Sequence, residues 1–278
     1  MPPTPAQLDH ATATTPIISL EGVSKSFGDV RALQEVTIHI PPGKTTVILG
    51  PSGCGKSVML KHIIGLLKPD AGSVTFDGQR VDRLREHEMN DIRTQVGFLF
   101  QQGALFDSMT VGQNIGFPLR EHSDLSFQER AQRVDRMLEI VGVPGTADRM
   151  PAELSGGQQK RVALARAVIL EPSVVLYDEP TTGLDPIRSD IIARLIQRLQ
   201  ARLSLTSVVV THDITTAFKI ADTMVMMQNG HVLLSGPPSK FKSSDDEVVR
   251  RFLDGDAGPS AFDLPDPTDD SLAEDNHS

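Results

Sequence analysis

The stretch GPSGCGKS, from Gly50 to Ser57, decides the fold of this chain. It follows the apolar run TTVIL (45–49) and precedes a helical pattern that extends from Ser57 to about residue 67. The spacing G-x4-G-K-[ST] between a strand and a helix is that of a phosphate-binding loop. Its glycines let backbone N–H groups converge on phosphate oxygens, and the helix adds the positive end of its dipole. The sequence therefore predicts a phosphate site here rather than an ordinary glycine-rich turn.

The side chains of this loop have separate expected roles. Lys56 can reach the β- and γ-phosphates of a nucleoside triphosphate, and the Ser57 hydroxyl can bind Mg²⁺. The remaining positions are expected to contribute to binding of ATP mainly through their backbone: Gly50, Pro51, Ser52, Gly53, Cys54, Gly55 and Val58.

The pattern of apolar runs predicts an α/β fold. Strands are expected at 36–40, 45–49, 96–100, 174–178 and 207–211, and the last two are nearly all apolar, as in central parallel strands buried on both faces. A helix is expected over 186–203, with Asp185 as its N-cap and proline in its first position. An antiparallel hairpin is expected to turn at Asn229-Gly230. The sum is an α/β core with antiparallel β additions, which together with the phosphate loop resembles the P-loop NTPases and their RecA-like parallel sheet.

The chain divides into three expected parts. Residues 1–16 are rich in Pro, Thr and Ala and predict a disordered lead, residues 17–255 are expected to form one domain, and residues 256–278 predict an acidic, flexible tail. Within the domain, about 101–166 has helical patterns without a strand and predicts a helical subdomain. The tail contains Phe262 and Leu264, so docking of the tail on a partner ATPase or a regulatory subunit is the alternative to disorder.

The composition limits the kinds of partner and the cellular compartment that are expected for this chain. The 278 residues carry 27 Lys and Arg against 36 Asp and Glu, and this net charge of −9 argues against a nucleic-acid partner. The single cysteine, Cys54, cannot form an internal disulfide, which favours the cytoplasm. No stretch approaches the roughly 20 apolar residues of a membrane span, so other subunits would have to provide one.

Two adjacent carboxylates end the buried run VVLYDEP (174–180). Ligands of parallel α/β sheets bind beyond the carboxyl ends of the strands, where Asp178 and Glu179 are expected. Asp178 would hold Mg²⁺ through its water shell, and Glu179 would orient or deprotonate a water molecule for attack on the γ-phosphate. A solvated acidic turn is the alternative interpretation.

A second anion site is predicted by ELSGGQQKR (153–161). Ser155 precedes a helical pattern and has Gln158 three residues later, which is the spacing of a capping box. Gly156 and Gly157 leave the N–H groups of the first turn open to a ligand.

The phosphate loop, LSGGQ and the Asp-Glu strand end, in this order, resemble the ATP-binding cassette (ABC) ATPases over about 17–253. The resemblance implies that Phe27 stacks on adenine, although burial in a core is the alternative for a lone phenylalanine. It implies that Gln101 senses Mg²⁺ and the attacking water, with Gln102 as the alternative in register. Asp185 matches the D-loop of the family, and His212 matches the histidine that contacts the γ-phosphate.

The family further implies a homodimer. Its LSGGQ segment acts on the ATP that the other protomer holds, and the residues concerned here are Ser155, Gly156, Gly157 and Gln158. A lone histidine at a strand end is otherwise more often structural, and the surrounding motifs favour the functional role for His212.

The segment FLFQQGALFDSMTVGQNIGFPLREH (98–122) lies where the family receives helices of membrane subunits. Leu105, Phe106 and Met109 are expected either to form an apolar groove floor or to fill the core of the helical lobe. With GPSGCGKSVMLK and DEVVRRFLDG, this segment resembles the ATPases of MCE/Mla-type lipid transporters.

This second resemblance implies an ATPase that powers lipid transport across the bacterial envelope. The expected partners are integral-membrane permease subunits and an MCE-domain lipid-binding protein, and the expected location is the cytoplasmic side of the inner membrane. An importer ATPase for another small solute, or a soluble ABC ATPase without a transport role, is the alternative.

Overall fold

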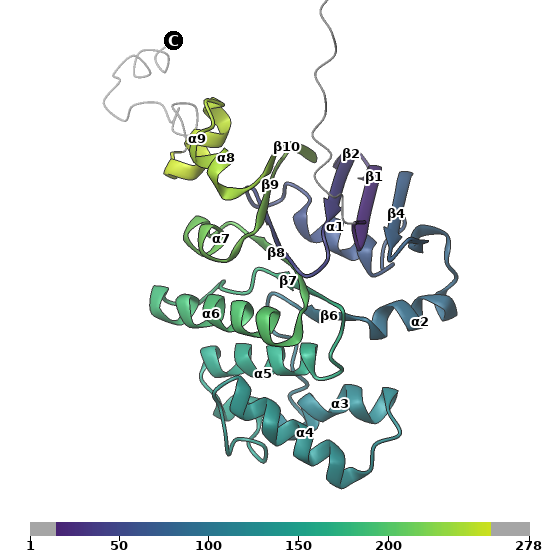
Figure 1. Ribbon diagram of the computed structural model, residues 1–278, viewed down its shortest axis with the longest axis vertical. Coiled ribbons are helices and arrows are strands. Elements are labelled where there is room, and N and C mark those ends of the chain that lie inside the picture. The colour runs from purple at the N-terminus through teal and green to yellow at the C-terminus, as the bar shows by residue number, and fades with distance from the viewer. Residues whose placement is uncertain (1–14, 257–278) are drawn as a thin grey trace, which may run out of the picture.

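The computed structural model describes residues 15–256, which form a six-stranded sheet, a separate four-stranded sheet and the helices around them (Figure 1). The expectation for the acidic tail, including Phe262 and Leu264, lies outside the described residues apart from position 256. The expectation for the lead likewise lies outside them, apart from positions 15 and 16.

The six-stranded sheet has the order β10-β9-β3-β8-β7-β6, and all of its strands run parallel except β10. Its strands are β3 (Thr45–Leu49), β6 (Val96–Leu99), β7 (Val174–Asp178), β8 (Thr206–Thr211), β9 (Thr223–Gln228) and β10 (His231–Gly236). The central strands are buried on both faces, which explains why their sequences are nearly all apolar. The predicted fold class is therefore confirmed.

The four-stranded sheet is antiparallel and has the order β2-β1-β4-β5. Its strands are β1 (Ile18–Phe27), β2 (Val30–Ile40), β4 (Ala71–Phe76) and β5 (Gln79–Arg80). The predicted strand 36–40 lies in β2, and it therefore belongs to this antiparallel addition and not to the parallel sheet. Its buried residues alternate with exposed Thr37 and His39, because this sheet packs on the core with one face only.

Helix α1 (Lys56–Ile63) follows the phosphate loop and packs between the two sheets. It is shorter than predicted, because Gly65 adopts a φ of +66° and its N–H bonds to the carbonyl of His62. The 3-10 turn Val81–Arg83 and helix α2 (Glu86–Thr94) lead from β5 to β6.

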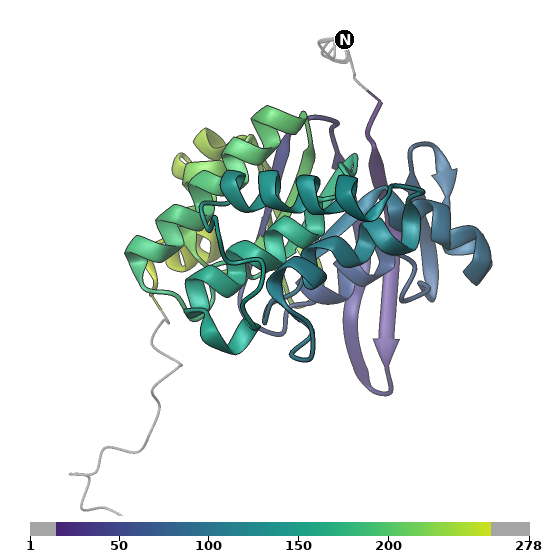
Figure 2. The same ribbon diagram turned by 90° about the horizontal axis from the view of Figure 1, so that it is seen from below.

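The chain between β6 and β7 is helical. It contains α3 (Val111–His122), α4 (Phe127–Ile140), a 3-10 turn (Pro151–Glu153) and α5 (Gly156–Val168), which together lie below the main sheet in Figure 1 and cover one side of the molecule in Figure 2. These helices share one apolar core with the lower face of the sheet. Within 15–256, no helix has both the length and the hydropathy needed to cross a membrane.

The last part of the described chain adds α6 (Pro186–Leu203), α7 (Ile214–Ile220), α8 (Pro238–Lys242) and α9 (Glu247–Asp254). Helix α6 has the predicted bounds, and Asp185 caps it by accepting a 2.9 Å hydrogen bond from the N–H of Arg188. The β9–β10 hairpin turns at Asn229 and Gly230, as predicted.

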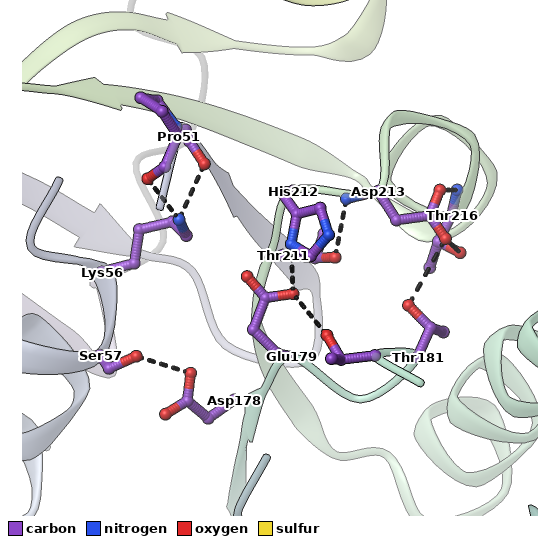
Figure 3. A network of polar contacts seen from close by, with 12 residues as sticks. Pro51, Lys56, Ser57, Asp178, Glu179, Thr181, Thr211, His212, Asp213 and Thr216 are labelled. Atoms are coloured by element: carbon purple, nitrogen blue, oxygen red, sulfur yellow. Dashed lines mark hydrogen bonds and ion pairs between the residues drawn. The ribbon is translucent and has the colours of Figure 1, made fainter. Parts of the chain in front are cut away.

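Parallel strands end at the same edge of a sheet. The phosphate loop follows β3, the carboxylates follow β7 and His212 follows β8, and these three strands are neighbours. The fold therefore brings the predicted motifs together at one edge (Figure 3).

Candidate active site

The phosphate loop has a shape that only glycine permits at two of its positions. Gly50 has a φ of +152°, and a Cβ there would lie 2.2 Å from the carbonyl oxygen of Met227. Gly55 has a φ of +103°, and a Cβ there would lie 2.3 Å from the carbonyl oxygen of Ala32. The loop is therefore held between two backbone segments that come from opposite ends of the chain.

Lys56 lies at the start of α1 with its ammonium turned back into the loop. Its Nζ donates hydrogen bonds to the carbonyls of Gly50, at 2.8 Å, and Pro51, at 2.9 Å (Figure 3). Cys54 is also buried here, and burial raises the pKa of its thiol. The loop thus holds a cation at its centre that forms no ion pair with a carboxylate of residues 15–256, which suits an anionic ligand.

Ser57 and Asp178 bring two oxygen atoms together from α1 and β7. The Ser57 hydroxyl donates a 2.8 Å hydrogen bond to Oδ1 of Asp178. Hydroxyl and carboxylate oxygens are the hard donors that Mg²⁺ prefers, so Ser57 would bind the ion directly and Asp178 would hold it through its water shell. Burial raises the pKa of the Asp178 carboxyl, and the bond from Ser57 opposes this effect. No group of three or more His, Cys, Asp or Glu side chains that could hold a metal occurs within 15–256.

Glu179 is buried immediately beyond the end of β7. Its backbone adopts a φ of +50°, a conformation that non-glycine residues rarely take and that is common at functional sites. Its N–H still continues the strand ladder by donating to the carbonyl of Val210. Its Oε2 accepts a 3.3 Å hydrogen bond from Thr182.

His212 faces Glu179 from the end of β8. Its Nδ1 lies 2.9 Å from Oε2 of Glu179, while the imidazole remains about half exposed toward the site. The following turn is fixed because Asp213 caps α7 through Thr216 and its N–H donates to Thr211 at 3.0 Å. His212 therefore contacts the predicted base, which favours a functional role over a purely structural one.

The LSGGQ segment forms the predicted capping box at the start of α5. The Ser155 N–H donates a 2.9 Å hydrogen bond to the side-chain oxygen of Gln158, and the Gln158 N–H donates a 3.4 Å hydrogen bond to the Ser155 hydroxyl. Ser155 and Gly156 are exposed, and Gly157 is buried. Within 15–256, no hydrogen bond or ion pair joins this segment to Lys56. The segment is thus an open helix start at a separate place on the surface.

Three other predicted residues lie at the edges of this site. The Phe27 ring at the end of β1 is 46% exposed, so burial in a core is excluded for it. Asp185 caps α6 and forms an ion pair with Arg188 at 3.2 Å. Gln101 and Gln102 both lie in the exposed turn after β6, and within the described chain neither side chain hydrogen-bonds to Ser57 or Asp178.

Lys160 is a residue of this region that the sequence analysis missed. It lies on the buried stripe of α5 with Gly157 and Leu164, and its Nζ donates to the backbone carbonyl of Gln101. A lysine at helical spacing among buried positions is a signal that it has an internal partner. The partner itself, 59 residues away in sequence, cannot be read from that signal.

Three features at one edge of the sheet define a P-loop nucleoside triphosphatase. They are a phosphate loop whose conformation requires glycine, two adjacent oxygen donors of the kind that Mg²⁺ prefers, and a buried glutamate. Comparison with known proteins specifies the class further. The family model described as ABC transporter matches residues 33–182, and the chain therefore belongs to the ABC transporter family of ATP-binding, ATP-hydrolysing proteins.

Individual relatives cover most of the chain. The "Intermembrane phospholipid transport system ATP-binding protein MlaF" of Haemophilus influenzae is 41% identical over 250 residues, which are 90% of this chain and 95% of the relative. The "Probable ribonucleotide transport ATP-binding protein mkl" of Mycobacterium leprae is 44% identical over 86% of this chain and 69% of the relative. These matches confirm the resemblance to ABC ATPases and to those of the Mla type.

A solved structure shows the same fold. The ATP-binding cassette MJ0796, in a dimeric post-hydrolysis state bound to ADP and phosphate, superimposes with a TM-score of 0.74 and is 35% identical. The match covers 79% of this chain and 98% of that cassette.

Proposed function

We propose that this chain is the ATP-hydrolysing subunit of a membrane transporter that moves phospholipids or related lipids across the bacterial envelope. The observation that carries this proposal is the 41% identity to a phospholipid-transport ATP-binding protein over nearly the whole length of both chains. The chain would work as a homodimer on integral-membrane permease subunits, at the cytoplasmic side of the inner membrane, with an MCE-domain protein as lipid carrier.

The binding of ATP would use the phosphate loop. Lys56 would exchange its bonds to Gly50 and Pro51 for the β- and γ-phosphates, and backbone N–H groups from Gly50 to Val58 would surround the phosphates. Phe27, 46% exposed at the end of β1, would stack on adenine, and Nζ of Lys25 lies 5.7 Å from its ring centroid. Mg²⁺, held by Ser57 and Asp178 with Gln101 nearby, would neutralise part of the charge on the phosphates.

Hydrolysis would depend on the contact between Glu179 and His212. The Glu179 carboxylate would orient a water molecule and accept its proton as the water oxygen attacks the γ-phosphorus and the bond to ADP breaks. His212, fixed by the turn at Asp213, would hold the carboxylate through Nδ1 and present the rest of its ring to the γ-phosphate. The low exposure of Glu179 limits competing contacts with bulk water.

A second copy of the chain would complete each site. Ser155, Gly156, Gly157 and Gln158 form an open helix start, and among residues 15–256 no hydrogen bond joins it to the phosphate loop of its own chain. Facing the loop of the partner, these groups would bind the γ-phosphate as a helix start binds an anion. Asp185 lies at the start of α6, where the D-loop of the family would meet the partner.

The permease would bind in an apolar groove of about 530 Å³ between the sheet and the helical layer. Four aromatic rings line it in two pairs: Phe98 with Phe100, with centroids 4.3 Å apart, and Phe106 with Phe117, with centroids 5.2 Å apart. Of the three apolar residues expected either in a groove or in the core, Phe106 lines this groove and Leu105 packs against the core. A groove of aromatic rings with arginines at its rim suits a short amphipathic helix.

A second candidate cargo comes from the Mycobacterium leprae relative, whose name assigns it to ribonucleotide transport. A transporter of another small solute would use the same ATPase chemistry, so the catalytic residues do not discriminate between cargoes. A soluble ABC ATPase without membrane partners would leave the aromatic groove without an occupant.

The test is to purify the full-length chain from native membranes in mild detergent and to analyse what accompanies it. We expect integral-membrane subunits and bound phospholipid, and we expect vesicles with the complex to transfer labelled phospholipid but not a labelled ribonucleotide. Phe106→Asp should lose the membrane subunits while keeping ATP binding, and Phe127→Asp, at an exposed phenylalanine that does not line the groove, is its control. Recovery of the chain without membrane subunits would overturn the proposal, and ribonucleotide transfer would replace its cargo.

A further inference from the structure

Lys160 is a buried cation that connects α5 to the turn after β6. The residue is 7% exposed, and its Nζ donates a hydrogen bond to the carbonyl of Gln101. Burial lowers the pKa of this ammonium, while the nearby carboxylates of Asp178 and Glu179 act in the opposite direction. Burying an ammonium is costly unless it is paired or hydrogen-bonded, so this contact orders the loop that contains the carbonyl.

Arg166, six residues further along α5, holds the next part of the same turn. Its Nη2 donates to the carbonyls of Gly103, at 3.0 Å, and Ala104, at 2.9 Å. Its guanidinium also lies 5.5 Å from the ring centroid of Phe106. Helix α5 therefore donates hydrogen bonds to three backbone carbonyls within four residues, and the carbonyl of Gln101 is the one that Lys160 holds.

We propose that Lys160 is a positioning residue for ATP hydrolysis, which acts by fixing the backbone of Gln101. The inference rests on the proposed role of Gln101 at Mg²⁺ and the attacking water. Gln101 lies in a turn that is closed by a 2.8 Å hydrogen bond from the Gly103 N–H to the Phe100 carbonyl, and the bond from Lys160 adds a second restraint, on the carbonyl of Gln101 itself. Loss of the contact would let the Gln101 amide sample positions away from Asp178 and Glu179, which lowers turnover more than nucleotide affinity.

The experiment compares Lys160→Met with two other variants of the full-length protein. Lys160→Met keeps the length of the side chain and removes the donor, and we expect turnover to fall about tenfold with the Kd for ATP changed less than twofold. Lys160→Arg keeps a donor and should recover most of the turnover. Lys68→Met is the matched control, because Lys68 also donates to a backbone carbonyl, that of Leu84 at 3.2 Å, and lies outside the proposed site. It should turn over at the wild-type rate.

A double variant separates positioning from a general structural effect. If Lys160 acts through Gln101, Lys160→Met should change turnover less than twofold in a Gln101→Ala background. The same tenfold loss in both backgrounds would overturn the role of Lys160 and leave that of Gln101 intact. Wild-type turnover of Gln101→Ala would instead overturn the role of Gln101, and the role of Lys160 with it. If Lys160→Met does not fold, Lys160→Leu, which also removes the donor, replaces it with the same expected result.

Discussion

The Glu179 carboxylate lies 2.9 Å from Nδ1 of His212, and the two residues follow adjacent parallel strands. The register of those strands pairs Asp178 with Val210, and the Glu179 N–H extends the ladder by one further bond to Val210. The contact is therefore set by strand pairing rather than by a loop. A slip of one residue in either strand would turn the side chains to the opposite face and separate the pair.

Glu179→Gln should bind ATP normally and almost abolish hydrolysis. The amide keeps the shape of the side chain but cannot accept the proton of the attacking water, and general-base catalysis contributes about 10²- to 10⁴-fold. The measurement is the steady-state ATPase rate together with the Kd for ATP. Glu139→Gln, an exposed carboxylate on α4, is the control. Full hydrolysis by the Glu179 variant would remove this residue as the base.

Lys56→Ala should weaken nucleotide binding itself. Lys56 is the buried cation of the phosphate loop, and hydrogen bonds to charged groups contribute about 1.5–3 kcal/mol each. The Kd for ATP should therefore rise on the order of 10- to 100-fold in equilibrium binding measurements. Lys44→Ala, which removes an exposed lysine 3.6 Å from Asp222, should bind ATP as the wild type does. An unchanged Kd for the Lys56 variant would contradict its place at the phosphates.

Gly55→Ala should destabilise the protein more than Gly53→Ala. Both glycines have positive φ, of +103° and +80°, so alanine strains the backbone at either position by about 1–3 kcal/mol. Only at Gly55 would the added Cβ also collide with a main-chain oxygen, that of Ala32; around Gly53 nothing lies within 4 Å. Thermal unfolding of the two variants gives the comparison. Equal Tm values would mean that the loop can move away from Ala32.

His62 should make the protein less stable in mild acid. Burial lowers the pKa of this α1 imidazole below its ordinary value of 6.5, so the unfolded chain takes up a proton more readily than the folded one. The stabilising contribution of neutral His62 is complete above about pH 6.5 and falls below it, by at most about 1.4 kcal/mol per pH unit. Denaturant unfolding at pH 7.5 and 5.5 should show a smaller acid effect in His62→Met than in the wild type.

The exposed His87 on α2 provides the control for this measurement. His87→Gln should retain the wild-type difference between the two pH values. If His62→Met retains it as well, the acid sensitivity has its origin in other groups.

The strands of the parallel sheet could be predicted because burial on both faces leaves a continuous apolar run. Helix α6 could be predicted to the residue, because Asp185 and Pro186 mark its start. Strand β1 could not be predicted from the sequence pattern. Its pairing shifts register between Leu20 and Val23, around Gly22 with a φ of +58°, and such bulges interrupt the alternation that identifies a half-buried strand.

The meeting of the phosphate loop with Asp178, Glu179 and His212 follows from motifs placed at the ends of neighbouring parallel strands. The contact between Lys160 and Gln101 does not follow, because it depends on how α5 packs under the sheet. Local pattern identifies which residues are unusual, and tertiary packing decides which carbonyl or carboxylate they contact.

The backbone carbonyls that lie against Gly50 and Gly55 limit how far this domain can be shortened or transferred into another protein. Met227 and Ala32 both lie outside residues 33–182, the segment that matches the family, although their carbonyls border the phosphate loop. A fragment trimmed to residues 33–182 would retain the phosphate loop, LSGGQ and the two carboxylates. It would lose the backbone carbonyls that lie against Gly50 and Gly55. A shortened version of the domain should therefore retain strand β2 and the β9–β10 hairpin. Both elements shape the phosphate loop, although neither contains a nucleotide-binding motif.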